Sequence, residues 1–356
     1  MKIGILTHHY ISNFGAFLQA YALQRAVKKM YPNDEVLIIN HINIKHFVIN
    51  NGGWFRYYKD RESIKSWQQK IKLPVTFHKA RKEFLETTRT CFSVKDINEL
   101  KLDCIIIGSD EVWNYKEAKG NAKVKFGYGL DCKKIIAYAP SVGKSAVGED
   151  VIPTYVKEGL DKFSAISARD DLTALFVEKV VGKQATRVLD PTFLSEFPKV
   201  KNVIKEKKPY ILFYYCERLP RAMRDRIVQF AEEKGYDIYG AGECDKLYKE
   251  ITVNLSPFEW VQMFRDAEFV FTGTFHGAVF SILNRKQFAC YLTNPSRVKK
   301  VNALLDELQI RERVIKEELN LEKLLIEKID YISTYEIIDK KRKNSLDYLR
   351  NSISNN

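Results

Sequence analysis

Short apolar runs alternate along the chain with stretches in which apolar residues recur about every 3.6 positions. Residues 2–7 form the first apolar run, and their composition suits a strand that is buried on both faces. A loop of mostly polar residues follows, and the periodicity over residues 16–30 then predicts a helix. The same alternation continues through the sequence, which predicts an α/β fold with parallel sheets.

The predicted elements fall into two halves. Residues 196–209 hold five lysines and two prolines, a composition typical of a linker. We therefore expect a first Rossmann-like domain over 1–195, a second over 196–333 and a peripheral C-terminal helix over 334–356, with the two domains facing a central cleft. The further predicted strands are 36–39, 104–107, 134–138 and 163–168 in the first half, and 210–215, 236–239, 268–272 and 287–292 in the second. The further predicted helices are 221–234, 257–266 and 277–283.

The composition indicates a folded, soluble protein of two domains. The chain has 356 residues, 45% of them hydrophobic and 12% aromatic, which excludes a disordered or fibrous protein. No apolar run reaches the roughly 18–20 residues that span a bilayer, and the N-terminus lacks the apolar stretch of a signal peptide. Six widely spaced cysteines, with no Cys-x-x-Cys pair, indicate reduced thiols. We expect a cytoplasmic protein.

The net charge of +13 is unevenly distributed. Residues 45–90 carry eleven Lys or Arg against four acids, with Trp54 and Trp67 among them. Basic residues interleaved with aromatics suit a phosphate-rich partner, and an anionic membrane surface at the inner face of the membrane is one such partner. Nucleic acid is not expected, because no nucleic-acid-binding motif accompanies the charge. The alternative is a solvated helical excursion whose aromatic residues pack on the first domain.

Several common chemical motifs are missing from the sequence. It contains no G-x-G-x-x-G, no G-x-x-x-x-G-K-[ST] and no G-x-S-x-G, which argues against a dinucleotide enzyme, a P-loop NTPase and an α/β-hydrolase. It also lacks an Asp-x-Asp pair and a His-x-x-x-His pair. We expect chemistry that uses neither a metal nor a cofactor.

The most specific local feature surrounds His276. Residues 269–281 are predicted to form a strand, a tight turn and a helix, with His276 at the start of the helix. A helix N-terminus attracts anions, and an imidazole there can bind a phosphate or carboxylate or deliver a proton. The alternative is a histidine that only caps its own helix.

Other candidate residues also follow predicted strands. Arg169 and Arg297 are cations suited to an anionic ligand, with a salt bridge to Asp170 or Asp171 and an ordinary helix-start arginine as the respective alternatives. Asp110 can activate a hydroxyl group and Trp113 can stack on a sugar, unless they are a turn residue and a packing residue. Ligands of open α/β sheets bind beyond the carboxyl ends of the strands, where all four are expected.

These motifs together resemble the polysaccharide pyruvyl transferase family over roughly residues 2–313. The resemblance departs at four positions: Gly273 and Thr274 stand where Asp and Ser are expected, Glu111 replaces Gln, and Pro140 replaces a small residue. Its motifs, in chain order, are 13–24 (NFGAFLQAYALQ), 108–114 (GSDEVWN), 138–143 (YAPSVG), 167–170 (SARD), 189–191 (LDP), 274–277 (TFHG), and Arg297 with Leu304 and Leu305.

The resemblance implies a GT-B-like arrangement of the two domains, phosphoenolpyruvate as the donor, and a sugar of a glycan precursor as the acceptor. The product would be a pyruvate ketal that bridges two hydroxyls. The acceptor would be a glycan, a nucleotide sugar or a lipid-linked saccharide. Catalysis is then expected from His276 and Arg169, donor binding from Arg169, Thr274, His276, Gly277 and Arg297, and acceptor binding from Asn13, Gln19, Ser109, Asp110 and Trp113. The alternatives are a GT-B glycosyltransferase that uses a nucleotide sugar, and a non-catalytic protein that binds a glycan or a membrane.

Overall fold

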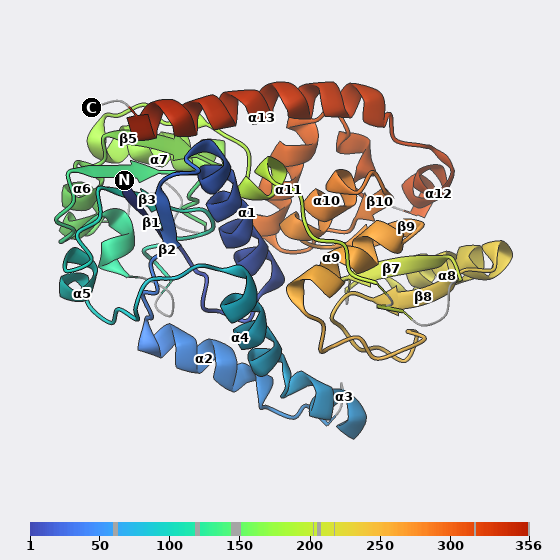
Figure 1. Cartoon of the computed structure of the whole chain (residues 1–356). Coiled ribbons are helices and arrows are strands. Elements are labelled where there is room, and N and C mark those ends of the chain that lie inside the picture. The colour runs from blue at the N-terminus through green and yellow to red at the C-terminus, as the bar shows by residue number, and fades with distance from the viewer. Residues whose placement is uncertain are drawn as a thin grey trace. The chain divides into compact units, whose positions relative to one another are not determined.

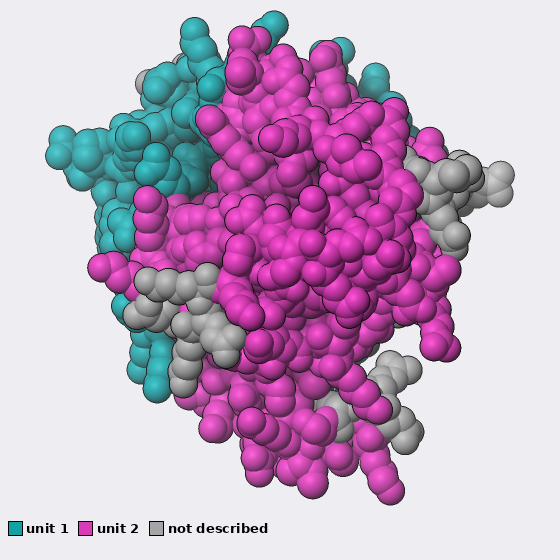
Figure 2. Space-filling view, turned by 90° about the vertical axis from the view of Figure 1, so that its right-hand side faces the viewer, with its two compact units in different colours: residues 1–53, 78–196, 339–356 teal, residues 54–77, 197–338 magenta. Residues whose placement is uncertain are grey.

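The computed structural model describes residues 1–59, 63–117, 122–143, 151–201, 203–204, 208–216, 218–316 and 318–354. The chain divides into two compact units (Figure 2). The first unit comprises residues 1–53, 78–196 and 339–356, and the second comprises residues 54–77 and 197–338.

The first unit is built on a six-stranded parallel sheet in the order β2-β1-β3-β4-β5-β6 (Figure 1). Its central strands are buried along almost their whole length, which explains why their sequences are continuous apolar runs. The predicted strands of this half all occur, within two residues of the expected bounds. The strands are β1 (Lys2–Leu6), β2 (Glu35–Ile38), β3 (Cys104–Ile107), β4 (Lys134–Ala137), β5 (Ala165–Ala168) and β6 (Thr186–Arg187).

The helices of the first unit begin with α1, which is long and almost entirely buried. Asn13 is its N-cap, and the Oδ1 atom of Asn13 accepts a hydrogen bond from the Ala16 amide at 3.0 Å. The helices are α1 (Phe14–Met30), α2 (Ile44–Trp54), α5 (Val94–Asn98), α6 (Thr154–Leu160) and α7 (Asp171–Val181), with the short 3-10 helices η1 (Lys123–Phe126) and η2 (Pro191–Leu194). The helix α4 (Leu73–Phe84) belongs to the first unit from residue 78 onward.

The second unit contains a four-stranded parallel sheet in the order β10-β9-β7-β8. The chain runs from β7 to β8 on one side and continues in β9 and β10 on the other, so the strand order reverses at β7. Ligands of such sheets bind at that reversal, beyond the carboxyl ends of the strands. The strands are β7 (Tyr210–Tyr214), β8 (Asp237–Gly240), β9 (Phe269–Thr272) and β10 (Gln287–Cys290).

In the second unit, α8 and α9 begin at their predicted residues, whereas α10 begins two residues before the predicted residue 277. Ser256 caps α9 and forms a reciprocal capping box with Glu259. The helices are α3 (Ile64–Lys70), α8 (Arg221–Lys234), α9 (Pro257–Asp266), α10 (Phe275–Leu283), α11 (Pro295–Glu307), α12 (Glu318–Ile326) and the 3-10 helix η3 (Arg311–Arg313).

Two segments differ from the expected domain organisation. Residues 54–77 belong to the second unit, although all of 45–90 was expected in the first. The Thr76 hydroxyl donates a hydrogen bond to Asn254 Oδ1 at 2.7 Å, which connects this segment to the rest of the second unit. The C-terminal helix α13 (Tyr331–Ser354) is also not merely peripheral, because Ile338, Leu349 and Ile353 on it are fully buried.

Candidate functional site

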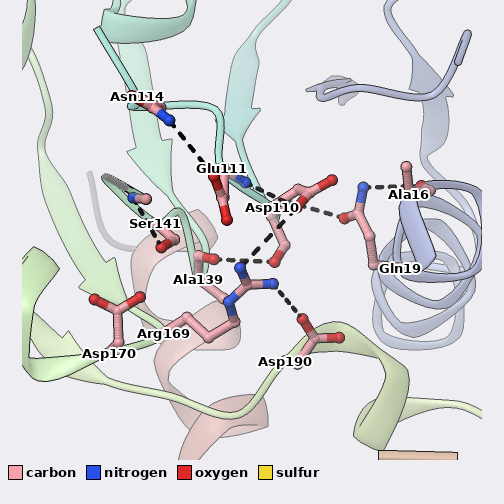
Figure 3. A network of polar contacts seen from close by, with 12 residues as sticks. Ala16, Gln19, Asp110, Glu111, Asn114, Ala139, Ser141, Arg169, Asp170 and Asp190 are labelled. Carbon is pink, nitrogen blue, oxygen red and sulfur yellow. Dashed lines mark hydrogen bonds and ion pairs between the residues drawn. The ribbon is translucent and has the colours of Figure 1, made fainter. Parts of the chain in front are cut away.

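In the first unit, the carboxyl ends of β3, β4 and β5 carry a network of polar contacts (Figure 3). Asp110 follows β3 with a backbone φ of 81°, a conformation that is costly for a residue other than glycine. Its carbonyl accepts a hydrogen bond from the Ser141 amide at 2.8 Å, and its carboxylate accepts one from the Glu111 amide at 2.8 Å. The carboxylate is therefore fixed at the end of the strand while its side chain stays 21% exposed.

Ser109 and Gln19 are structural members of this network. Both are fully buried. The Ser109 hydroxyl donates to the Ala139 carbonyl at 2.9 Å, and the Ser109 amide donates to Gln19 Oε1 at 3.2 Å. The Gln19 amide nitrogen donates in turn to Thr7 and to the Ala16 carbonyl. The expectation that Ser109 and Gln19 contact the acceptor is therefore wrong, because burial and these bonds keep them from a ligand.

Trp113 also differs from its predicted role. It is completely buried, and its indole N–H donates to the Lys125 carbonyl at 2.8 Å. Its ring stacks on Phe126 and meets Phe163 edge-on within the hydrophobic core. No face of Trp113 is left for a sugar, so the packing interpretation holds.

Arg169 follows β5 and is held between two carboxylates. One guanidinium nitrogen lies 2.9 Å from Asp190 Oδ2, and another lies 4.0 Å from Asp110 Oδ1 (Figure 3). Burial alone would lower the pKa of Arg169, but the charges of Asp190 and Asp110 outweigh it and raise that pKa. The salt-bridge interpretation thus holds with partners other than the expected Asp170 or Asp171. Arg169 also lies within ion-pair distance of Asp110. Asp190 belongs to the 189–191 motif but was not among the predicted site residues.

A cavity of about 350 Å³ lies beside Asp110. Its walls include His8, His46 and Glu111. The Tyr10 hydroxyl and His46 Nδ1 are 3.0 Å apart, which holds the His46 ring toward His8 with the two ring centroids 5.2 Å apart. Neither histidine was among the predicted site residues. His8 could have been predicted, because it follows the first strand. Asp110 was predicted on the same ground, since it follows a later strand.

A buried lysine lies behind this cavity. The Lys125 ammonium nitrogen is 2.7 Å from His8 Nδ1, and Lys125 has no exposed surface. Burial lowers the pKa of Lys125 to about 7, against a weaker opposing effect of Asp110. Burial and the neighbouring Lys125 also hold the pKa of His8 well below its usual value. The site therefore combines His8, which is held neutral, with Lys125, whose pKa lies near neutrality.

In the second unit, His276 lies in the first turn of α10, directly beyond β9. The N-cap of α10 is Thr274, whose hydroxyl accepts a hydrogen bond from the Gly277 amide at 3.0 Å. His276 is therefore not the cap of its own helix, which removes the main alternative to a functional role. Gly277 is required for packing, since a Cβ atom there would lie 1.9 Å from Thr272 Oγ1.

Arg297 lies near this turn, because it contacts Tyr215, the residue that follows β7. Its guanidinium carbon is 5.3 Å from the centre of the Tyr215 ring, within the range of a cation–π contact. Gly273 explains one departure from the family pattern, because its Cβ position lies 2.3 Å from the Tyr215 carbonyl. Tyr215 directly after β7, His276 in the first turn of α10 and Arg297 in the first turn of α11 thus lie at the carboxyl ends of the strands.

A metal site is not evident in the described parts of the chain, where no three His, Cys, Asp or Glu side chains form a cluster that could hold an ion.

Comparison with known proteins gives a family and a fold. A family model described as polysaccharide pyruvyl transferase matches residues 13–295. No curated protein matches the sequence. UGT89C1 of Arabidopsis thaliana, solved with UDP-L-rhamnose, is 10% identical and has a TM-score of 0.52, and the alignment covers 99% of this chain and 98% of that one. The UDP-GlcNAc 2-epimerase of Neisseria meningitidis, bound to UDP-GlcNAc, is 11% identical over 100% of both chains, with a TM-score of 0.50.

Such low identities establish the fold alone. Both structures match along nearly the whole chain, and each unit here is an α/β domain on a parallel sheet. The predicted fold class, two Rossmann-like domains of the GT-B type, is confirmed.

Proposed function

Because the chain belongs to the polysaccharide pyruvyl transferase family, we propose that it transfers the pyruvyl group of phosphoenolpyruvate to a sugar of a glycan or glycan precursor. The observation that carries this proposal is the position of His276. It lies in the first turn of α10 beyond the carboxyl end of β9, next to an N-cap supplied by Thr274. A histidine on a helix N-terminus combines a proton donor with the positive end of a helix dipole.

The donor is an enol phosphate with two anionic groups. In the proposed site, the phosphate lies at the N-terminus of α10 near Thr274 and Gly277, and Arg297 in the first turn of α11 binds an anionic group of the donor. Arg169 was also predicted to bind the donor. Its pairing with Asp190 and Asp110 favours a positioning role instead, because carboxylates of the protein already balance the charge of the guanidinium.

The proposed reaction begins with proton transfer from His276 to the methylene carbon of the donor. The carbon that bears the phosphate becomes oxocarbenium-like, and a sugar hydroxyl adds to it and loses its proton. The C–O bond to phosphate then breaks, inorganic phosphate leaves, and the second hydroxyl adds and loses its proton. The product is a cyclic ketal that carries the pyruvate carboxylate, and the net reaction consumes two hydroxyls and releases one phosphate.

The acceptor is proposed to bind at the cavity of the first unit. Asp110 is the candidate base for the attacking hydroxyl, because its carboxylate is fixed and partly exposed beside that cavity. Asn13 is exposed at the start of α1 and remains a predicted acceptor contact. His8 and His46 join it as candidates, since they line the cavity that Asp110 also lines.

The test is release of inorganic phosphate from phosphoenolpyruvate that depends on added saccharide, with the ketal identified by mass spectrometry. His276→Gln should lower kcat by about 10²–10⁴-fold, the usual contribution of a general acid. The exposed His78 on α4 provides the control, and His78→Gln should leave kcat unchanged. Activity of His276→Gln near that of the wild type contradicts the proposal, as does turnover of a nucleotide sugar in place of phosphoenolpyruvate.

We also propose that α2 contacts an anionic membrane surface. Ile44, Val48 and Ile49 on α2 are exposed to solvent, and the exposed Lys45 lies among them. Apolar side chains beside basic ones are typical of helices that lie in a membrane interface. In the described ranges no helix combines the length and apolarity needed to cross a bilayer. Sedimentation with vesicles should depend on anionic lipid, and equal binding to neutral vesicles contradicts the proposal.

A further inference from the structure

Tyr215 contacts both parts of the candidate donor site in the second unit, although the proposed reaction gives it no role. It directly follows β7, where the strand order of the sheet reverses. Its ring lies under the guanidinium of Arg297, whose carbon is 5.3 Å from the centre of the ring. Its carbonyl lies 2.3 Å from the position that a Cβ atom of Gly273 would occupy, so the turn that leads to His276 packs directly on its backbone.

The backbone at Tyr215 is fixed in a conformation that is costly for a tyrosine. Its φ of 57° lies in the left-handed region. The peptide group that joins Tyr214 to Tyr215 is hydrogen-bonded at both ends: its N–H donates to Glu243 Oε1 at 2.7 Å, and its carbonyl accepts from the Gly273 amide at 3.0 Å. A strained conformation persists only where the surrounding structure holds it, and such residues are concentrated at binding and catalytic sites.

The ring of Tyr215 is also held by the core of the second unit. The Tyr214 ring meets it edge-on, with the two ring centroids 4.9 Å apart. Tyr214 is itself buried and meets the rings of Trp260 and Phe264 edge-on. The Tyr215 ring is therefore a fixed support for the guanidinium of Arg297.

Stacking on a ring leaves a guanidinium able to bind an anion. The ring contacts the face of the guanidinium, whereas carboxylates and phosphates bind the N–H groups along its edge. An arginine side chain loses rotamer freedom when it binds a ligand, and a ring that already holds the guanidinium reduces that loss. Tyr215 is thus able to strengthen the binding of an anion by Arg297 without touching the anion.

A second tyrosine–arginine pair in the same unit lies away from the site. The guanidinium carbon of Arg285 is 4.3 Å from the centre of the Tyr335 ring. Arg285 follows the C-terminal end of α10, whereas His276 lies at the N-terminal end. The Tyr335 hydroxyl donates to the Leu283 carbonyl at 2.9 Å, so this pair serves the packing of α13 on α10. It provides a matched control.

We propose that Tyr215 is a positioning residue of the donor site, because it holds the guanidinium of Arg297 ready for an anionic group of phosphoenolpyruvate. This inference rests on the proposed function, in which Arg297 binds the donor. The Tyr215 side chain acts through Arg297 and does not touch the reacting atoms. It should therefore affect the binding of the donor and leave the chemical step unchanged.

The experiment is calorimetric titration of the full-length protein with phosphoenolpyruvate and with inorganic phosphate, together with KM and kcat for ketal formation. Tyr215→Leu should raise Kd and KM for phosphoenolpyruvate about three- to tenfold, the usual range for loss of a cation–π contact, with kcat within about twofold of the wild type. Tyr215→Phe keeps the ring and should restore KM to within about twofold. Tyr335→Leu, measured at a temperature where it is folded, should leave both constants unchanged.

A double-mutant cycle tests whether Tyr215 acts through Arg297. Arg297→Ala removes the cation that the ring is proposed to hold. In that background, Tyr215→Leu should produce no further loss of phosphoenolpyruvate binding, because both substitutions remove the same interaction. Additive losses would mean that the ring contributes to binding by another route.

The inference and the proposed function fail in different ways. The inference alone is overturned by unchanged donor binding in Tyr215→Leu, by a fall in kcat without a rise in KM, by an equal loss in Tyr215→Phe, or by additive losses in the cycle. Donor binding that Tyr215→Leu weakens, without ketal formation from any saccharide, overturns the proposed function alone. A wild-type protein that binds neither phosphoenolpyruvate nor inorganic phosphate overturns both, because Arg297 then holds no anion.

Discussion

The pair formed by Arg169 and Asp190 links the stability of the first unit to its candidate site. The Asp190 side chain is fully buried and that of Arg169 is 6% exposed. Arg169→Gln should lower the free energy of unfolding by about 3–5 kcal/mol, because it leaves the Asp190 carboxylate buried without its charged partner. Chemical denaturation measures this change. Arg187→Gln breaks the more exposed pair with Asp171 and should cost at most about 1 kcal/mol.

The same variant distinguishes a positioning role from a donor-binding role. If Arg169 positions Asp110, Arg169→Gln should lower kcat while KM for phosphoenolpyruvate changes little, measured at a temperature where the variant is folded. A large rise in KM for phosphoenolpyruvate at unchanged kcat would instead support the donor-binding role that the sequence predicted.

Lys125 makes the stability of the first unit depend on pH. Its pKa is about 7 in the folded protein, and its ordinary value, which applies to the unfolded chain, is 10.5. Between these two values the unfolded chain binds one more proton, so stability rises with pH there, by up to about 1.4 kcal/mol per pH unit. Below about pH 7 Lys125 is protonated in both the folded and the unfolded state. The folded protein then bears the full free-energy cost of burying the charged ammonium. The groups that face Lys125 include His8, Asp110 and the ring of Tyr10.

Lys125→Met should therefore unfold at higher denaturant concentration than the wild type at pH 6, and its advantage should shrink from pH 7 to pH 9. Urea titrations at pH 6, 7, 8 and 9 provide the measurement. Lys123→Met, two residues away on an exposed side chain, should follow the wild type at every pH. Parallel curves for Lys125→Met and the wild type would show that Lys125 has an ordinary pKa.

At the scale of the element, the start of α10 depends on the close packing of Gly277 against β9. Gly277→Ala brings a Cβ atom within 1.9 Å of Thr272 Oγ1 and 2.9 Å of Thr274 Oγ1, so the helix start must shift. We expect a loss of stability of about 1–3 kcal/mol, together with a fall in kcat because His276 moves with the helix. Phosphate release and thermal unfolding measure the two effects.

A glycine in another helix provides the control. A Cβ atom at Gly53 in α2 meets nothing within 4 Å, so Gly53→Ala should be neutral or stabilise the protein by up to about 1 kcal/mol. A Gly277→Ala enzyme with full activity would mean that the position of His276 is not set by this packing.

The elements that the sequence predicts best are those whose residues are all buried. The strands β3 and β9 are continuous apolar runs, and the sequence located them within one residue. The bounds of α2 and α4 were not predicted, because apolar residues such as Val48 and Val75 face solvent and obscure the periodicity of a buried face. Among the site residues, those that follow strands were predicted, because their placement depends only on the order of elements along the chain.

Partners that lie far apart in the sequence were not predictable. Lys125 meets His8 across 117 positions, and Asp190 meets Arg169 across 21. The sequence suggested that Trp113 stacks on a sugar, because its position along the chain does not distinguish an exposed ring from a buried one. Its contacts with Phe126 and Phe163 come from segments that the fold alone brings together.

At the scale of the whole molecule, the excess of 58 basic over 45 acidic residues predicts how the protein behaves at an anionic surface. Binding to vesicles of phosphatidylcholine with 30% phosphatidylglycerol (about a third anionic, as in a strongly charged leaflet) should fall as NaCl increases from about 0.05 to 0.5 M, because salt screens exposed charges. A fraction of the binding should survive high salt, since the exposed apolar side chains of α2 contribute a part that does not depend on charge.

Val48→Asp should remove the salt-resistant fraction of the binding, because Val48 is 59% exposed on α2. Ile332→Asp, at an 80% exposed position on α13, is the control that should retain it. Binding that is insensitive to salt, or equal loss in the two variants, would contradict a membrane contact made through α2.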